Sequence, residues 1–391
     1  MNDLVSLLSA DWNYPTSIRA GAGRVNELAD ACQSLGIGSP LLITDTGLAD
    51  LPMVRNALKI CRDAGMQCGL YSAVQSNPTG KNVTEGVAAY LAGNHDGVIA
   101  FGGGSGIDAG KAIALMVGQA RPLWDFEDAG DNWTRVNPAS VAPIVAVPTT
   151  AGTGSEVGRA AVITDTDKQI KKLIFHPKML PALVILDPEL TVGLPAHITA
   201  ATGLDALSHS LEAFCSPFYH PMAEGIAMEG IRLVFDYLPR AVERGEDIEA
   251  RTQMLVASSM GATAFQKGLG GMHAIAHTLG ALYGAHHGLL NAILMPYVLV
   301  ANREKISQKI ERLAHYLQLN EPGFEGFLRR VLDLRDHLGI PNALTAIGID
   351  DAQSERVGRM SVVDPSARGN PITFSEQQYS AIFVKAVRGE L

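Results

Sequence analysis

An apolar run that leads directly into a glycine-rich loop constrains the first half of this chain most strongly. Residues 97–101 form a strand pattern, residues 102–105 the loop, and residues 107–117 a helical pattern that follows at once. A strand, a glycine turn and a helix in this order are typical of a β-α-β unit, which builds a parallel sheet. The free backbone N–H groups at the start of such a helix predict a phosphate or pyrophosphate site, and a simple tight turn is the alternative.

The match of this loop to a dinucleotide fingerprint is weak. Residues 104–109 fit the pattern G-x-G-x-x-A. That fingerprint belongs to the first βα turn of a domain, however, and this loop follows a later strand. The prediction of a phosphate site therefore depends on the backbone geometry expected there.

The same alternation of strand and helix extends over residues 1–190. Helical patterns separate the strand patterns, with strands at residues 41–45, 69–71, 97–101, 143–147 and 182–186 and helices at residues 25–35, 51–64, 83–92 and 107–117. This order predicts a doubly wound, Rossmann-like α/β domain with a parallel sheet. Asp45 ends a strand, where a carboxylate suits the hydroxyls of an NAD ribose and repels a 2′-phosphate; a helix cap or turn residue is the alternative.

From about residue 191 onward the pattern becomes helical. Long amphipathic segments occupy residues 223–242, 249–264, 289–302, 305–317 and 324–338, and little strand signal remains. A chain of 391 residues also exceeds the usual size of a single core. The sequence thus predicts an all-α C-terminal domain, residues 191–391, after the α/β domain of residues 1–190.

Histidines are concentrated in one short window of the helical half. Four of the chain's 11 histidines lie there, at His273, His277, His286 and His287. His273 and His277 are four residues apart, so on a helix they share one face. Their neighbours are small or apolar, which makes a solvated face a poor explanation. The window is therefore either a set of satisfied core histidines or a metal site, since neutral imidazole is the commonest transition-metal ligand.

A second pair with the same spacing strengthens the metal hypothesis. Asp205 and His209 are also four residues apart, within the segment TAATGLDALSHSLEAF. One carboxylate and three imidazoles would give four ligands. Such a set suits Fe(II) or Zn(II) better than Mg(II) or Ca(II), which prefer oxygen ligands.

Composition narrows the function classes. The formal net charge of −9 argues against a nucleic-acid surface, which would need a basic stripe. No run of about 18 apolar residues occurs, so no membrane span is expected. The four cysteines, Cys32, Cys61, Cys68 and Cys215, are scattered, and the first residues lack the basic region of a secretory signal. Both features predict a cytoplasmic protein with reduced thiols.

Over essentially the whole chain, these motifs resemble those of the iron-containing (group III) alcohol dehydrogenases. The family's GGGSxxDxxK loop is similar to GGGSGIDAGK at residues 102–111, and its second nicotinamide-side motif is similar to PTTAGTGSEV at residues 148–157. The segments ITDTDKQIKK, DPELTVGLP, TAATGLDALSHSLEAF and GMHAIAHTLGA…HHG follow in the family's order.

The resemblance implies roles for the matching residues. Asp205, His209, His273 and His287 would bind the metal, with His286 as a neighbour and a minor alternative to His287. The non-ligand His277 would face the substrate and the nicotinamide. The dinucleotide would be lined by Asp45, Asn77, Gly103, Gly104, Ser105, Asp108, Thr149, Thr150 and Lys171. Lys172, beside Lys171, is an alternative for the lysine.

The resemblance also implies the activity. Hydride would pass between NAD(H) and a small primary alcohol or its aldehyde, with a divalent metal, Fe(II) or alternatively Zn(II), polarising the substrate oxygen. A homodimer or larger homo-oligomer is expected from the family. One alternative is a metal- and NAD-dependent cyclase or lyase of the dehydroquinate-synthase type, which would need basic residues around the histidines that the sequence lacks. The other is a non-enzymatic metal- or nucleotide-binding protein, which would not need both sites.

The chain departs from the commoner family pattern just before the histidine window. Many members have a small, neutral Asn-Ala-Gly-like run there, whereas this chain has AFQKGLG at residues 264–270. If Lys267 faced the substrate, an anionic far end would compensate its charge, as in an ω-hydroxy acid or its semialdehyde. The alternative is that Lys267 reaches the surface or pairs with a nearby acid.

Overall fold

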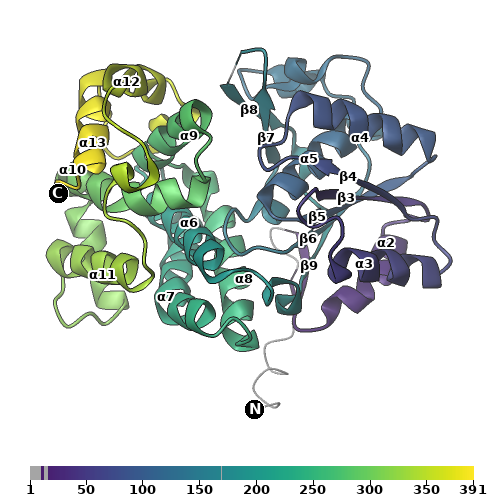
Figure 1. Ribbon diagram of the computed structural model, residues 1–391, viewed down its shortest axis with the longest axis horizontal. Coiled ribbons are helices and arrows are strands. Elements are labelled where there is room, and N and C mark those ends of the chain that lie inside the picture. The colour runs from purple at the N-terminus through teal and green to yellow at the C-terminus, as the bar shows by residue number, and fades with distance from the viewer. Residues whose placement is uncertain (1–9, 13–15, 169) are drawn as a thin grey trace. The chain divides into compact units, whose positions relative to one another are not determined.

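The computed structural model describes residues 10–12, 16–168 and 170–391. The chain divides into two compact units, residues 1–193 and 194–391 (Figure 1). Among the described residues, no helix is both long and apolar enough to cross a membrane.

The first unit is built on a seven-stranded sheet with the order β1-β2-β9-β6-β5-β3-β4. Its strands are β1 (Ala10–Trp12), β2 (Ser17–Ala20), β3 (Pro40–Asp45), β4 (Gly69–Val74), β5 (Gly97–Gly102), β6 (Ile144–Pro148) and β9 (Leu183–Leu186). Neighbours pair in parallel, except that β1 is antiparallel to β2. β4 lies on one side of β3 and β5 on the other, so the carboxyl ends of β3 and β5 flank a topological switch point, where such sheets bind ligands.

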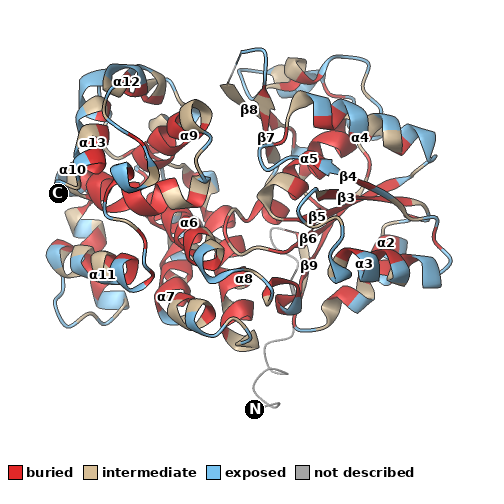
Figure 2. Ribbon diagram, viewed as in Figure 1, coloured by how far each residue is buried: buried red, intermediate tan, exposed pale blue. Residues whose placement is uncertain are grey.

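Helices cover both faces of this sheet. They are α2 (Leu28–Ser34), α3 (Pro52–Asp63), α4 (Gly80–Ala92) and α5 (Gly104–Met116). Alternate strand residues face opposite sides: Leu41 and Ile43 of β3 pack in the core with Ile113 of α5, whereas Leu42 packs with Val54 of α3 in the other core. Figure 2 shows the central strands as buried. The predicted doubly wound α/β fold is confirmed.

A separate antiparallel pair of strands was not predicted from the sequence. It consists of β7 (Ala160–Asp165) and β8 (Ile170–Phe175). β7 packs against α5, and its residues alternate between partly and fully buried. The polar residues of this segment conceal that alternation in the sequence, because several of them are paired with other residues in the fold.

The second unit is helical, and no strand occurs in residues 194–391, all of which the structure describes. Its helices are α6 (Ala196–Cys215), α7 (Pro221–Glu243), α8 (Ile248–Ala264), α9 (Gly271–Tyr283), α10 (His287–Tyr316), α11 (Phe324–His337), α12 (Ser354–Val362) and α13 (Glu376–Arg388). Helix α6 packs against α7, α8 and α10 and is buried along most of its length. The predicted all-α C-terminal half is confirmed.

Helix α10 is continuous where the sequence suggested two helices. The polar residues near position 302 interrupt the apolar pattern, but they do not end the helix. Asn302 is buried and exchanges hydrogen bonds of 2.9 and 2.8 Å with the Asn370 side chain. A polar residue that has a buried partner is thus compatible with the helix interior.

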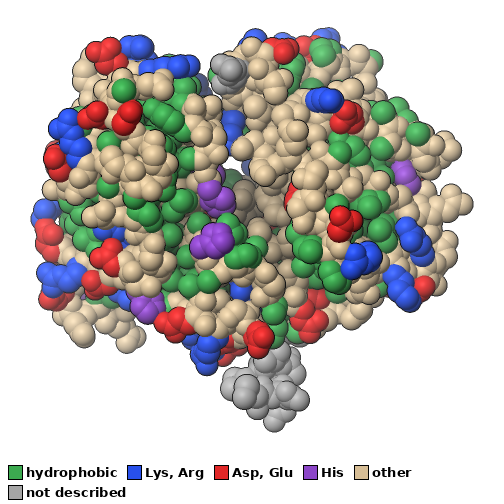
Figure 3. All heavy atoms as spheres, viewed as in Figure 1, with side chains coloured by type: hydrophobic (Ala, Val, Ile, Leu, Met, Phe, Trp, Pro, Cys, Tyr) green, Lys and Arg blue, Asp and Glu red, His purple; other side chains and the backbone are tan. Residues whose placement is uncertain are grey.

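Charged side chains on the surface are largely balanced locally. On the face shown in Figure 3, basic and acidic side chains are interspersed. Many pair within one helical turn, as Arg232 does with Glu229 and Asp236 of α7. Exposed pairs of this kind add little to stability.

Candidate metal centre and cofactor loop

Four side chains of the helical unit converge on one point. Asp205, His209, His273 and His287 each offer a ligand atom, and these atoms lie within 4.8 Å of one another. A single ion with bonds of about 2.0–2.2 Å can hold two ligand atoms on opposite sides of it. The ligand atoms here are at most a few tenths of an ångström farther apart than that. Asp205, His209 and His273 are buried, whereas His287 is partly exposed.

The hydrogen bonding of this cluster favours the metal hypothesis over a purely structural one. The Nδ2 amide of Asn291 lies 2.8 Å from Asp205 Oδ1, 3.2 Å from His273 Nε2 and 3.1 Å from His287 Nε2. An amide has two hydrogens, so it cannot satisfy three acceptors. Within the described part of the chain, His209 Nδ1 and Asn291 Oδ1 have no hydrogen-bond partner. Buried groups left in this state are costly. A cation bound by the four converging residues would balance the lone pairs that the single Asn291 amide cannot satisfy.

The sequence folds locally so that these residues meet. Asp205 and His209 lie one turn apart on α6, and His273 lies in the first turn of α9. His287 is the first residue of α10. Three helices therefore contribute to the cluster, and each contribution is fixed by the position of the residue along its helix.

The structure distinguishes His287 from its neighbour His286. His286 precedes α10 as its N-cap, is exposed, and accepts a hydrogen bond from Leu289 N at 3.3 Å. His287 joins the cluster. A Cβ on Gly288 would lie 2.5 Å from the Ala201 carbonyl oxygen, so the glycine allows the start of α10 to approach α6 closely.

Electrostatics favour the ligand forms of these residues. Burial alone would raise the pKa of Asp205, but the neighbouring imidazoles and the Asn291 amide outweigh it and hold the pKa below its usual range. Burial, reinforced by His209, holds the pKa of His273 well below its ordinary value. An ionised carboxylate and a neutral imidazole are the forms that bind a metal.

His277 lies beside the cluster and has an acidic partner. Its Nδ1 is 3.1 Å from Asp364 Oδ2, and its ring stacks on that of His287 with centroids 5.3 Å apart. Burial would raise the pKa of Asp364, but His277 outweighs it and lowers the pKa. If His277 donates its Nδ1–H to this carboxylate, its Nε2 is left as a proton acceptor.

Three functional candidates were missed from the sequence: Glu212, Asn291 and Asp364. Two had a usable signal, because Glu212 follows Asp205 by seven residues on α6 and Asn291 follows His287 by four on α10. Asp364 is 87 residues from His277, and no sequence pattern connects them.

The glycine loop of the first unit lies at the carboxyl end of β5. Gly103 is the N-cap of α5, and its position has no side-chain cap. Cβ atoms added at Gly103 and Gly104 would lie 3.2 Å from Thr150 Oγ1 and 2.6 Å from Thr153 Oγ1. Gly102 has a φ of 142°, which favours glycine. The loop thus packs closely under residues 150–153 and leaves the N–H groups at the start of α5 for a ligand.

Asp45 is brought beside this loop at the end of β3. Its Oδ1 accepts hydrogen bonds from Gly47 N at 2.9 Å and Leu48 N at 3.2 Å. Its Oδ2 lies 3.4 Å from the position of a Cβ on Gly102. Burial raises the pKa of Asp45, and the backbone donors oppose this effect. Oδ1 therefore stabilises the turn after β3, while Oδ2 lies next to the glycine loop.

The remaining predicted cofactor residues lie around the same strand ends. Thr149 donates its backbone N–H to Gly102 O at 3.0 Å, which joins the segment after β6 to the end of β5. The Ser105 hydroxyl bonds to the carbonyl oxygen of Ser76, which precedes the exposed Asn77. Loops from different strands are thus brought together at one edge of the sheet.

Asp108 has a mainly structural set of contacts. Its Oδ1 accepts from the Ser155 hydroxyl, its Oδ2 accepts from Val162 N at 2.9 Å, and Lys111 Nζ lies 3.1 Å from Oδ1. These bonds tie α5 to residues 155–162. Both carboxylate oxygens are engaged by the protein.

The two neighbouring lysines of β8 have different environments. Lys172 pairs with Glu127 at 2.9 Å and with Asp165 at 3.5 Å. Lys171 points to the opposite side of the strand, because successive side chains alternate. Burial lowers the pKa of Lys171, and the charge of Asp108 partly opposes this. The hydrogen bonding therefore favours Lys171 as the lysine available to a cofactor.

Lys267 does not have the position that an anionic substrate would require. Its ammonium is fully buried and donates to Glu224 Oε1 at 2.8 Å, Ser216 O at 2.9 Å and Phe214 O at 3.2 Å. It therefore pairs with an acid in the first turn of α7, which is the alternative stated above, and the hypothesis that it faces the substrate is wrong. Lys309 donates to the same three oxygens at 2.9–3.0 Å.

Comparisons with known proteins agree with this geometry. A family model described as "Iron-containing alcohol dehydrogenase" matches residues 15–188, and one described as "Fe-containing alcohol dehydrogenase family, C-terminal" matches residues 199–387. A 4-hydroxybutyrate dehydrogenase from Cupriavidus necator is 38% identical over 376 residues, which cover 94% of this chain and 97% of the relative.

Two further matches cover nearly the whole chain. A 1,3-propanediol dehydrogenase from Klebsiella pneumoniae is 36% identical over 389 residues, 96% of this chain and 98% of the relative. The crystal structure of a 1,3-propanediol oxidoreductase superposes with a TM-score of 0.91 at 35% identity, and the match covers 97% of this chain and 99% of the other. The chain belongs to the iron-containing alcohol dehydrogenase family.

Proposed function

We propose that this protein is a metal-dependent oxidoreductase that uses NAD(H) to interconvert a small primary alcohol and its aldehyde. The observation that carries the proposal is the convergence of Asp205, His209, His273 and His287 in a chain of this family. The protein's own hydrogen bonds leave that cluster incompletely satisfied. Both the donor set and the family are those of a metal enzyme.

The donor set fits a transition metal. Three imidazoles and one carboxylate suit Fe(II), in keeping with the family, and Zn(II) is the alternative. A bound ion would supply Lewis-acid chemistry that polarises the substrate oxygen. The four side chains would fix its position, and the lowered pKa values of Asp205 and His273 favour the ionised carboxylate and the neutral imidazole that a ligand needs.

The cofactor would bind at the carboxyl ends of the parallel strands. The residues proposed to line it are Asp45, Asn77, Gly103, Gly104, Ser105, Asp108, Thr149, Thr150 and Lys171. Backbone N–H groups at the start of α5 would hold the pyrophosphate, and Asp45 would hold the ribose hydroxyls and disfavour a 2′-phosphate. The nicotinamide carries the hydride.

His277 would handle the proton of the substrate hydroxyl. Its Nδ1 is held by Asp364 at 3.1 Å, which favours a basic Nε2. We therefore propose that His277 accepts the proton during alcohol oxidation and that Asp364 positions its ring.

The functions proposed for the two domains are those predicted from the sequence. Residues 1–190 would form the dinucleotide-binding domain and residues 191–391 the metal-binding catalytic domain. The four cysteines are free, which supports a cytoplasmic location. A homodimer or larger homo-oligomer is proposed from the family resemblance.

The proposed substrate is a small primary alcohol. The similar proteins are named for 4-hydroxybutyrate, 1,3-propanediol and methanol, which share a primary hydroxyl and differ at the far end. The first of these substrates has an anionic far end. Lys267 gives no support for such a substrate here, because its ammonium is already paired with Glu224.

The test is a substrate panel on protein of known metal content. Enzyme loaded with Fe(II) or Zn(II) should form NADH steadily from at least one of methanol, 1-butanol, 1,3-propanediol and 4-hydroxybutyrate. His273→Ala should lose metal and activity together, because the coordination set is broken. Full metal occupancy in that variant would refute the ligand assignment. No NADH from any alcohol would refute the activity, since a cyclase that uses NAD transiently forms none.

A further inference from the structure

The first turn of α9 is capped by residues from outside that helix. Its N-cap, Gly270, has no side chain to satisfy the free N–H groups of the turn. Glu212 of α6 accepts from Gly270 N at 2.7 Å and from Met272 N at 2.7 Å. Asn370 accepts from Gly271 N at 2.9 Å. A buried carboxylate and a buried amide thus complete the start of the helix.

The same carboxylate also contacts a residue of the metal cluster. His273 Nδ1 lies 2.7 Å from Glu212 Oε2, and both side chains are buried. The oxygens of an ionised Glu212 only accept hydrogen bonds, so in this state Nδ1 must carry the hydrogen. The lone pair of His273 is then on Nε2, the atom that faces Asn291 and the cluster.

Glu212 lies on the helix that supplies the other cluster residues. Asp205, His209 and Glu212 are separated by four and three residues on α6, so they share one face. Two of them contribute atoms to the cluster directly, and the third contacts His273. Helix α6 therefore determines the placement of three of the four candidate ligands.

We propose that Glu212 is a positioning residue that holds His273 in the ring orientation and tautomer needed to bind the metal. This inference rests on the proposed function, in which His273 is a ligand. Partners of this kind fix the tautomer of a ligating histidine, and their loss typically lowers metal affinity by about 10- to 100-fold.

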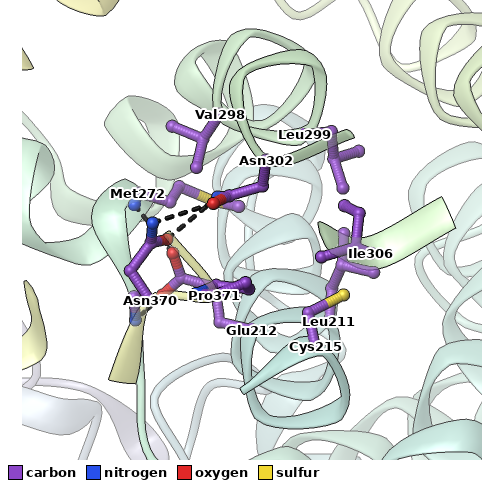
Figure 4. Close-up of a pocket in the computed structure, with 11 residues that line it drawn as sticks. Leu211, Glu212, Cys215, Met272, Val298, Leu299, Asn302, Ile306, Asn370 and Pro371 are labelled. Carbon is purple, nitrogen blue, oxygen red and sulfur yellow. Dashed lines mark hydrogen bonds between the residues drawn. The ribbon is translucent and has the colours of Figure 1, made fainter. Parts of the chain in front are cut away.

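The competing explanation is that Glu212 merely caps α9. The structure provides a matched control for it, because Asn370 caps the same turn and has no hydrogen bond to His273. Glu212 and Asn370 lie on the wall of one small cavity, about 20 Å³ in volume (Figure 4). Glu212→Ala would enlarge this cavity and admit water that could replace the carboxylate as an acceptor, so an isosteric variant is the sharper test.

Glu212→Gln keeps the shape but cannot keep all three contacts. The carboxylate accepts on one oxygen from Met272 N and on the other from Gly270 N and His273 Nδ1. An amide offers one acceptor oxygen, so one set of donors must face its NH₂ group. If that set includes His273, the favoured tautomer places a hydrogen on Nε2, which blocks metal binding there.

The experiment compares Zn²⁺ affinity in the full-length, Zn²⁺-loaded protein. Wild type, Glu212→Gln, Asn370→Ala and His273→Ala are titrated with a chromophoric chelator, and thermal melting is recorded for each. We expect Glu212→Gln to bind Zn²⁺ about 10- to 100-fold more weakly. Asn370→Ala should lower the melting temperature but leave the affinity within about threefold of wild type. Glu212→Asp, whose carboxylate is one carbon shorter and reaches less far toward His273 Nδ1, is measured in the same way and carries the test alone if Glu212→Gln does not fold.

Three results would overturn the inference in different ways. Wild-type affinity in both Glu212→Gln and Glu212→Asp, together with loss of metal in His273→Ala, would leave the ligand assignment intact and show that Glu212 does not position His273. Equal weakening in Asn370→Ala would show that helix capping alone controls affinity. Wild-type affinity in His273→Ala would refute the ligand assignment of the proposed function, and the inference would fail with it.

Discussion

Replacing Lys267 with methionine should leave the protein as stable as wild type or more stable at neutral pH. Lys267 and Lys309 donate to the same three oxygens, those of Phe214, Ser216 and Glu224. One ammonium is therefore sufficient for these acceptors. Removing one partner of a buried ion pair is usually destabilising because the other charge is left unpaired. Here Glu224 keeps Lys309 and Arg312 as partners, and methionine fills the buried space with an apolar side chain of similar length.

The size of the effect follows from the burial of Lys267. Burial, reinforced by Lys309 and opposed by Glu224, lowers the pKa of Lys267 to about 8. An unfolded lysine titrates near 10.4, and each pKa unit corresponds to about 1.4 kcal/mol. Keeping Lys267 charged in the fold thus costs roughly 3 kcal/mol. In wild type this cost is fully present below pH ~8 and is relieved as the pH rises from about 8 to about 10.4, where the unfolded chain holds one more proton.

The assay is thermal melting of wild type and Lys267→Met between pH 7 and pH 9.5. Wild type should gain stability relative to the variant above pH ~8, with a shift of about 2–4 °C for each kcal/mol in a unit of this size. Lys309→Met is the matched control. Lys309 helps to lower the pKa of Lys267. In Lys309→Met, the gain in stability that follows deprotonation of Lys267 should therefore begin at a higher pH. In addition, Lys267→Met should leave the KM for 4-hydroxybutyrate and for 1-butanol unchanged.

Two results would refute this reasoning. A loss of more than about 2 kcal/mol at pH 7 in Lys267→Met would mean that Lys309 does not replace Lys267. A change in KM for the acidic substrate alone would mean that Lys267 does act on the substrate, contrary to its buried pairing with Glu224.

Two further predictions concern the cofactor and the proton. In Asp45→Gly, kcat/KM for NADP⁺ divided by kcat/KM for NAD⁺ should rise by about tenfold or more, because the carboxylate beside Gly102 opposes a 2′-phosphate. A wild-type enzyme that already prefers NADP⁺ in initial-rate assays would contradict this interpretation of Asp45. Asp364→Asn should lower kcat by about tenfold or more with no loss of metal, because His277 loses the carboxylate that holds its Nδ1. Loss of metal along with activity would instead mean that Asp364 stabilises the metal cluster.

The fold was predictable where local pattern and tertiary structure agree. The apolar strands β3, β5 and β6 are buried on both faces, and their sequences show it directly. The pair β7 and β8 was missed, because Lys172 and Asp165 make these segments look exposed. Both side chains are buried, and they pair with each other at 3.5 Å. Only the three-dimensional contacts explain why such polar residues lie inside.

The residues that meet at the metal cluster were predictable because their spacing is periodic. Asp205 and His209 share a helix face, and a one-turn spacing is visible in any sequence. The partner of His273 is 61 residues away, and that of His277 is 87 residues away. Local spacing carries no information about which acid reaches which imidazole. The sequence left two alternatives open for Lys267 for the same reason, since its acceptors at Phe214 and Ser216 lie 53 and 51 residues away.

Helix α6 is both the buried core element of the helical unit and the carrier of Asp205 and His209. Any ion held by these residues would therefore bind the folded unit and not the unfolded chain, and its binding energy would add to the stability of that unit. Each tenfold rise in free metal above the dissociation constant would add about 1.4 kcal/mol. Metal supply would then set how long the helical unit survives heat or proteolysis, as well as whether it is active.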